Sequence, residues 1–203
     1  MPGIDSLITN SLSKEIKNRL DKKVLHQIER KLFIKNGLSI RQSMMDFEKF
    51  DNVLKEFLGS GSQDLEKLCI NQIYAVNGFE KNNVLVQIKS PNLIKFIMNC
   101  LGDEEIVKIL DVPINQSYSS SEIQVKTKVP KSSLYRKIKM LVTNGLLVKT
   151  KTVVSGSKKV DEYQTIFNRL TINYQARGLE MTCHVDKKIF EDSSIVNVQK
   201  RFT

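Results

Sequence analysis

The sequence predicts an α+β fold that is mainly helical, in which an N-terminal helical domain precedes a helix-turn-helix and a small antiparallel sheet. Three patterns lead to this prediction. Apolar residues recur at helical spacing through residues 4–73, two short helical patterns joined by a turn occupy residues 119–145, and residues 147–167 alternate as strands do. At 203 residues, the chain is long enough for one or two domains.

The N-terminal region begins with apolar residues at every fourth position, from Ile4 to Leu32. An α-helix has 3.6 residues per turn, so this series drifts around a straight helix by about 40° at each step. Either the helix breaks, which we expect within residues 18–23, or other helices pack around it on several sides. The first segment could pack on a second copy of the chain or within its own chain, and the spacing does not distinguish these alternatives.

A second helix is expected after Gly37, because Ser39 and Gln42 have the spacing of a capping box. Its broad apolar, aromatic-rich stripe continues to about Leu58 and is typical of a helix that packs on a core. A polar turn at residues 59–62 and a short third helix follow.

The period of the pattern then changes. Residues 74–88 predict two strands around a polar turn. Pro91 opens a helix that reaches Leu101, and a further helix is expected over residues 106–112. We place a domain boundary near Pro91, so that residues 1–90 form an N-terminal helical domain with a short hairpin, suited to dimerisation or sensing.

The helix-turn-helix pattern begins at Ser119. Ser119 and Glu122 have capping-box spacing, which predicts the start of a short helix. Pro130 then separates two helices, because a proline disfavours helical geometry in the residue before it and suits the first turn of a new helix. The apolar side of the first helix consists of Ile123 and Val125, continued by Val129.

The second helix of the pair is expected over residues 131–144, and Gly145 follows as a C-terminal cap. Leu134, Ile138, Leu141 and Val142 share one face at helical spacing. A helix with this apolar face and a cationic, small-residue opposite face is typical of a major-groove recognition helix. An ordinary solvated surface helix has the same pattern. The opposite face carries Ser132, Ser133, Arg136, Lys139, Met140 and Thr143.

A basic β-hairpin is predicted directly after this helix, over residues 147–167. Leu147, Lys149, Lys151 and Val153 lie on one side of its alternating first strand, and Lys158 and Lys159 lie at its polar tip. Helix-turn-helix followed by such a hairpin is the winged-helix arrangement. The hairpin, or wing, of this arrangement contacts phosphates or the minor groove.

The segment VPKSSLYRKI (129–138), continued by Leu141, Gly145-Leu146-Leu147, Lys158-Lys159-Val160, Tyr163 and Phe167, resembles archaeal winged-helix transcriptional regulators of the ArsR-like class. The resemblance covers residues 101–185 and implies a DNA-binding winged helix-turn-helix. Residues 29–68 also resemble a helical module that precedes winged helices in some archaeal regulators. Metal-sensing members of the class use clustered Cys or His ligands, which this chain lacks, so metal sensing is not implied.

The charge balance indicates a polyanionic partner. Lys and Arg number 32 against 22 Asp and Glu, which gives a net charge of +10. Such a balance favours nucleic acid or another polyanion as a partner. A membrane surface is not favoured, because the sequence has no Trp, no long basic amphipathic helix and no apolar run of spanning length. No signal sequence is recognised, so a cytoplasmic protein without a membrane partner is expected.

Catalytic and metal chemistry are not predicted. Cys69, Cys100 and Cys183 are widely spaced in apolar surroundings, which is typical of buried thiols, although a redox role for Cys69 or Cys100 stays open. His26 and His184 have no neighbouring carboxylate motif. The chain has no paired carboxylates, Ser/His/Asp arrangement, phosphate-binding glycine loop or metal-ligand spacing. We therefore expect neither an enzyme nor a cofactor.

We predict a sequence-specific regulator that binds double-stranded DNA, with residues 91–186 as the winged helix-turn-helix domain and 187–203 as a tail that is partly disordered or docks as a short helix. A homodimer through the N-terminal helices is expected. The alternative is a winged helix that serves as a protein-interaction module of the transcription machinery. The predicted DNA-binding residues are Lys126, Lys128, Lys131, Ser132, Ser133, Tyr135, Arg136, Lys139, Lys149, Lys151, Lys158 and Lys159.

Overall fold

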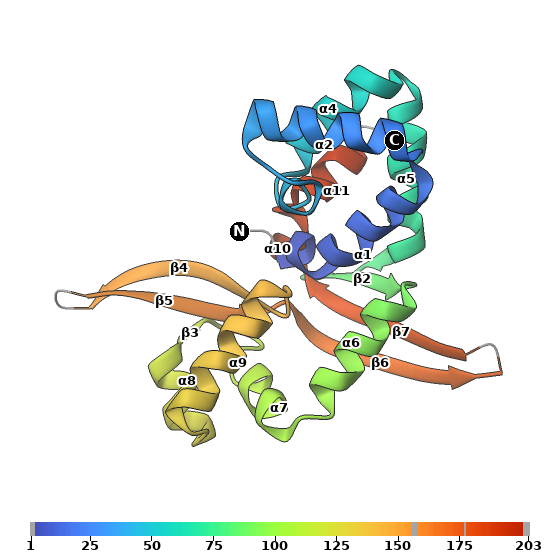
Figure 1. The fold of residues 1–203 in the computed structure, drawn as a ribbon. Helices are drawn as coiled ribbons and strands as arrows, with labels where there is room; N and C mark the ends of the chain where they lie inside the picture. Colours follow the sequence, from blue (N-terminus) through green and yellow to red (C-terminus); the bar gives the residue numbers. More distant parts are fainter. Residues whose placement is uncertain (1–2, 156–157, 177, 201–203) are drawn as a thin grey trace.

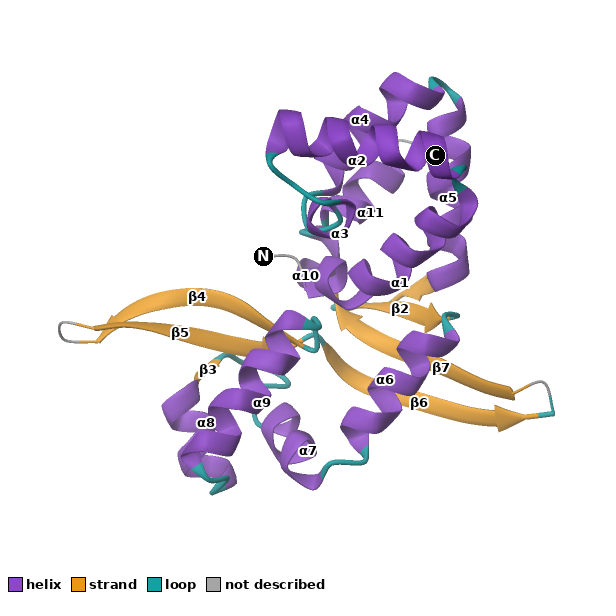
Figure 2. Ribbon diagram, viewed as in Figure 1, coloured by secondary structure: helices purple, strands orange, loops and turns teal. Residues whose placement is uncertain are grey.

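The structure is a computed structural model that describes residues 3–155, 158–176 and 178–200. These residues form an α+β fold with eleven helices and two small antiparallel sheets (Figures 1 and 2). The helices are α1 (Gly3–Arg19), α2 (Lys22–Asn36), α3 (Ile40–Ser43), α4 (Phe47–Leu58), α5 (Gly61–Ile73), α6 (Pro91–Leu101), α7 (Glu104–Asp111), α8 (Ser120–Thr127), α9 (Lys131–Thr143), α10 (Lys187–Glu191) and α11 (Ser194–Gln199). The strands are β1 (Tyr74–Phe79), β2 (Asn83–Ile88), β3 (Tyr118–Ser119), β4 (Leu147–Ser155), β5 (Lys158–Thr165), β6 (Phe167–Gln175) and β7 (Gly178–Asp186).

Helix α1 lies at the centre of the helical part and is buried on several sides. The expected break in the four-residue series is confirmed, because α1 ends at Arg19 and the Asp21 carboxylate caps α2 by accepting the Lys23 N–H at 2.8 Å. Both Ile4 and Ile16, at the two ends of the α1 stripe, are fully buried. The chain itself covers this stripe, so the apolar residues that suggested packing of α1 on a second copy are already buried within one copy.

The helix expected from residue 40 to Leu58 is interrupted, and this expectation was wrong. The capping box of Ser39 and Gln42 is present, but the four-residue α3 ends at Ser43 and α4 starts at Phe47. The Phe47 N–H donates to the hydroxyl of Ser194, 3.0 Å away in the C-terminal α11. A bond across this sequence separation could not be expected from local spacing.

The larger sheet has the strand order β1-β2-β7-β6 and joins distant parts of the chain. Strand β2 pairs with β7 from Asn83 opposite Asp186 to Ile88 opposite Met181. The domain boundary expected near Pro91 therefore separates β2 from β7 along the chain, although these two strands are paired neighbours in one sheet. Residues on both sides of that boundary contribute to one buried face.

The C-terminal residues dock against the N-terminal helices, as one of the two alternatives expected for the tail. The buried Asp5 carboxylate of α1 accepts hydrogen bonds from the Ser193 hydroxyl, from the N–H and hydroxyl of Ser194 at 2.8 and 2.7 Å, and from the Ile195 N–H at 3.4 Å. Burial raises the pKa of Asp5, and these hydrogen bonds oppose that rise. The carboxylate thus caps α11 and connects the two ends of the described chain.

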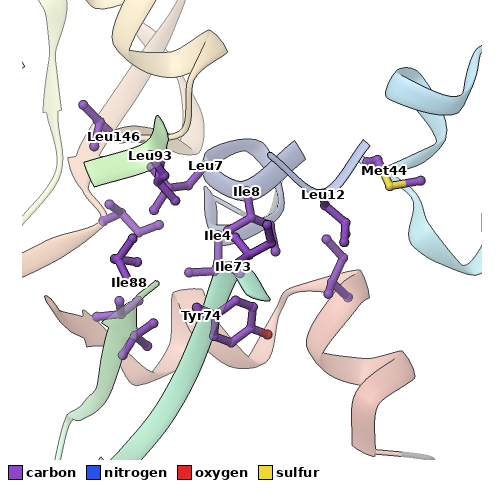
Figure 3. Packing of buried hydrophobic residues seen from close by; sticks show 14 of the residues in the cluster. Ile4, Leu7, Ile8, Leu12, Met44, Ile73, Tyr74, Ile88, Leu93 and Leu146 are labelled. Carbon is purple, nitrogen blue, oxygen red and sulfur yellow. The ribbon is translucent and has the colours of Figure 1, made fainter. Parts of the chain in front are cut away.

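The smaller sheet has the order β3-β5-β4 and packs beside helices α7, α8 and α9. A single cluster of buried residues continues from the helical part into this region. Figure 3 shows Leu7 of α1, Leu93 of α6 and Leu146 side by side, and Leu146 immediately precedes β4. One core therefore supports both sheets.

Candidate nucleic-acid interface

Nearly all of the net charge of the chain lies in one segment. Residues 118–160 contain ten Lys and Arg side chains and one acidic residue, Glu122. The remaining residues carry 22 cationic and 21 acidic side chains and are close to neutral. In the fold, this segment comprises β3, α8, α9 and most of the β4–β5 hairpin. A field this concentrated attracts polyanions to one side of the molecule.

Helix α8 begins with the predicted capping box. The Ser119 N–H donates to Glu122 Oε2 at 2.8 Å, and the Glu122 N–H donates to the Ser119 hydroxyl at 3.3 Å. The hydrogen bonds from the hydroxyl and N–H of Ser119 lower the pKa of Glu122. Lys128 ends the helix in the left-handed conformation, with φ of 57°, and turns the chain toward α9. The local sequence signals therefore set the angle between the two helices.

The apolar faces of α8 and α9 mostly match the predictions. Leu134, Ile138 and Leu141 of α9 are buried, and Ile123 of α8 is fully buried. Val125 was predicted to lie on the apolar side of α8, but 78% of its surface is exposed, so this prediction was wrong. Val125 follows Ile123 by two residues, which on a helix places it about 200° away from the buried side.

Lys137 anchors α9 to α7, although no sequence pattern singled it out. Its side chain is 8% exposed and its ammonium group forms ion pairs with Asp103 and with Glu105, the latter at 3.1 Å. Burial opposes the charge of Lys137, but hydrogen bonds to Asp103 and Glu105 raise its pKa overall. The same bonds lower the pKa of Asp103. One signal was available, because position 137 falls on the same side of α9 as Leu134 and Leu141.

Ser133 takes part in this anchor instead of facing outward. Its hydroxyl donates to Glu105 Oε2 at 2.6 Å. Hydrogen bonds from Ser133 and then from Lys137 lower the pKa of Glu105. Ser133 was predicted to contact DNA, and the structure instead places its hydroxyl in the contact between α9 and α7.

The outward face of α9 presents cations that have no internal partner. Within residues 3–155, 158–176 and 178–200, the side chains of Lys131, Arg136 and Lys139 form no hydrogen bond or ion pair, and all three are exposed. Ser132 and Tyr135 are exposed beside them, with 44% of Tyr135 accessible. Five of the predicted residues therefore lie together on one helix face, free to contact a ligand.

The predicted lysines of α8 lie next to this face. Lys126 and Lys128 are both exposed. The Lys126 ammonium lies 5.0 Å from the centre of the Tyr118 ring, a cation–π contact that leaves it accessible. The two lysines therefore extend the cationic surface from α9 along the turn.

Two of the wing lysines differ from those of α9, because carboxylates of the same hairpin form ion pairs with them. Lys149 pairs with Asp161 at 2.7 Å, and Lys151 pairs with Glu162 at 3.3 Å. The hydrogen bond from Lys149 lowers the pKa of Asp161. Lys159 is exposed at the far end of β5, and the side chain of Lys158 lies outside the described part of the structure.

The expected alternation along β4 was wrong at one point. The register shifts between Lys149 and Lys151, which lie opposite the adjacent residues Tyr163 and Glu162. Adjacent residues of a strand point to opposite faces, so this bulge places Lys149 and Lys151 on opposite faces of the hairpin. The alternation in the sequence predicted that Lys149 and Lys151 lie on the same face.

The sequence also bears on metal ligands, thiols and membrane-spanning helices. Among the described residues, no cluster of three or more His, Cys, Asp or Glu side chains could hold a metal ion. Cys69, Cys100 and Cys183 are free and buried, as predicted, and burial raises the thiol pKa to about 11, 11 and 12. No helix in the described ranges is both long enough and apolar enough to cross a bilayer.

Comparison with known proteins identified no relative: no family model, no curated protein and no solved structure matches this chain.

Proposed function

We propose that the chain is a transcriptional regulator that binds double-stranded DNA, with residues 103–167 as a winged helix and α9 as its recognition helix. The order α7-β3-α8-α9-β4-β5 and the sheet order β3-β5-β4 support this proposal. The resemblance of residues 101–185 to archaeal ArsR-like regulators points the same way. In this arrangement α9 enters the major groove and the β4–β5 wing lies along the backbone.

One observation carries the proposal: the outward face of α9 holds exposed cations without partners among the described residues, whereas its inward cation, Lys137, is fixed. Lys137 is held by α7, so it positions the helix and is not available to a ligand. Arg136, in contrast, has a planar guanidinium that fits the O6 and N7 acceptors of guanine. Lys131 and Lys139, one turn before and after Tyr135, suit flanking phosphates.

Secondary contacts come from α8 and the wing. Lys126 and Lys128 would hold the DNA backbone beside the recognition helix. Lys149 and Lys151 must exchange their carboxylate partners for phosphates, so their net contribution is smaller than that of the α9 cations. A homodimer would present two recognition helices to successive turns of DNA.

The second candidate is a protein-interaction module of the transcription machinery. It is favoured by exposed apolar side chains near the cations, because 78% of Val125 and 72% of Val154 are accessible. Exposed apolar groups next to cations suit an acidic, amphipathic protein partner. The same valines can also contact thymine methyl groups, so a binding experiment must decide.

The test is enrichment of fragmented genomic DNA by the purified full-length protein across a salt series. Arg136→Ala is compared with the matched control Arg30→Ala, which removes the same charge from an exposed position on α2. We expect selective enrichment of particular fragments by the wild type and the control, and loss of selectivity with Arg136→Ala, at about 1–3 kcal/mol per lost bidentate contact.

Two other results would contradict the proposal in different ways. Binding with a steep salt dependence but no selectivity, equal in all three proteins, would mean contact with the backbone alone. No binding at low salt would favour the protein-interaction module.

A further inference from the structure

We infer that the outer edge of β6 is the surface through which two copies of this chain associate, by antiparallel pairing of β6 with its own copy. This inference concerns the protein without DNA and does not depend on the proposed function. It locates the expected dimer in the larger sheet instead of the N-terminal helices, because the chain itself covers the α1 stripe.

Strand β6 is a long edge that the chain leaves open. In the sheet order β1-β2-β7-β6, its described neighbour is β7 alone. Beyond the shift between Phe167 and Arg169, the two strands pair in regular register from Arg169 to Gln175. The outer backbone groups of this stretch have no strand partner among the described residues. A regular, open edge of this length is a template for pairing with another strand.

Strands β1 and β4 carry features that discourage pairing, and residues 170–175 of β6, beyond its own register shift, do not. Strand β1 is short, at six residues, and a bulge interrupts it between Val76 and Gly78. Strand β4 has both a bulge and the lysines Lys149 and Lys151. Bulges and edge lysines are the devices by which proteins prevent edge-to-edge association.

Charge permits a second copy of the chain at this edge. Two molecules of net charge +10 repel each other wherever cations face cations. Residues 170–176 carry no charged side chain, so two such strands can approach without repulsion. Antiparallel pairing of identical strands also has twofold symmetry, which closes the assembly at two copies.

Part of the apolar face of the β6–β7 hairpin is exposed. Leu170, Ile172 and Tyr174 share one face of β6, where the first two are partly buried and 85% of Tyr174 is exposed. Its cross-strand partner Leu179 is 43% exposed and lines an open hollow of about 620 Å³ beside α6. The hollow is lined by Pro91, Ile94, Met98 and Leu179 and also by Lys89 and Lys95. The exposed Tyr174 beside Leu179 marks an interaction surface.

Symmetry and the period of the strand restrict the register. A twofold axis perpendicular to the sheet keeps the apolar faces of both copies on the same side of the sheet. This requires that one residue of β6 lies opposite the same residue of the second copy, with the axis between them. An axis at Ile172 pairs Tyr174 with Leu170 of the second copy and covers the exposed ring. Cross-strand pairs of this type stabilise antiparallel sheets.

Sedimentation equilibrium of the full-length protein without DNA tests the inference. The test variant is Asn173→Lys, and the control is Asn77→Lys, an exposed asparagine in the other edge strand, β1, of the same sheet. Because lysines near the axis repel each other, we expect a dimer for the wild type and the control, and a dimer dissociation constant raised about tenfold or more for Asn173→Lys. A monomeric wild type, or an unchanged constant for Asn173→Lys, would overturn the inference.

A cross-linking variant covers the case in which Asn173→Lys fails to fold. Cys69, Cys100 and Cys183 are buried, so an introduced thiol reacts with little background. We expect Ile172→Cys to form a disulfide-linked dimer under mild oxidation and Val76→Cys in β1 to remain monomeric. Cross-linking through position 76 and not through 172 would place the interface at the other edge.

Discussion

The two long hairpins of the molecule have similar backbones and opposite chemistry. The β4–β5 and β6–β7 hairpins each begin with a nine-residue strand and extend from the body in opposite directions (Figure 1). Lys149 and Lys151 lie along β4, and Lys159 lies in β5. Residues 170–175, which form most of β6, have no charge. We therefore propose a polyanion as the partner of the first hairpin and a second copy of the chain as the partner of the second.

The β4–β5 hairpin and α9 also differ in how many of their cations are already held in ion pairs. In β4–β5, carboxylates of the same hairpin hold Lys149 and Lys151. In α9, Lys131, Arg136 and Lys139 have no described partner. A free cation neutralises a phosphate without first losing an ion pair, so in the proposed DNA complex we expect α9 to supply more of the binding free energy than the wing.

The largest predicted effect is a change of folding stability with pH. It comes from a buried carboxyl group that belongs to neither hairpin. Glu66 in α5 is fully buried, and its carboxylate oxygens have no hydrogen-bond partner among the described residues. Burial, and then the nearby Asp51, raise the pKa of Glu66 to about 8. Stability is therefore complete below the unfolded-state pKa of about 4.3 and is lost as pH rises toward 8.

We expect the wild type to lose about 3–4 kcal/mol of unfolding free energy between pH 5 and pH 8, and Glu66→Gln to lose much less. Urea unfolding at a series of pH values measures this difference. The control, Glu104→Gln, removes a carboxylate from an exposed position in α7 and should keep the wild-type profile. A Glu66→Gln protein with the wild-type pH profile would show that Glu66 is ionised in the fold.

A smaller effect tests the neutralised state of the wing. Asp161→Asn removes the charge that holds Lys149 but retains an oxygen that can accept the Thr152 hydroxyl, which lies 2.9 Å away. We expect DNA affinity at low salt to rise about threefold. Asp64→Asn makes the same charge change at an exposed position in α5 and should have little effect. Equal gains in both variants would mean that net charge alone governs binding.

Features that depend on a few neighbouring residues were predictable from the sequence. The capping boxes of Ser39 and Ser119 occur as expected, and Gly145, expected as a cap after α9, has a left-handed φ of 73°. The buried stripe of α9 also follows from spacing alone, because helical periodicity repeats within four residues. The cationic helix face of the candidate site was found in this way.

Features that depend on distant residues were not predictable. The pairing of Asn83 with Asp186 and the capping of α11 by Asp5 bring together parts of the chain that share no local pattern. The same limit applies to the candidate site. Lys149 looks like a free cation until Asp161 is placed across the hairpin, and Ser133 looks outward until α7 is placed beside it.

The salt dependence of DNA binding most directly tests the claim that α9 is the main polyanion contact. Each phosphate neutralised contributes about 0.9 to the slope of log K against log salt concentration. Replacing Lys131 and Lys139, the two α9 cations assigned to phosphates, together by Ala should reduce the slope by about 1.8, whereas replacing the exposed Lys22 and Lys23 of α2 should leave it unchanged. Equal reductions in both variants, or no reduction in the α9 variant, would contradict the account.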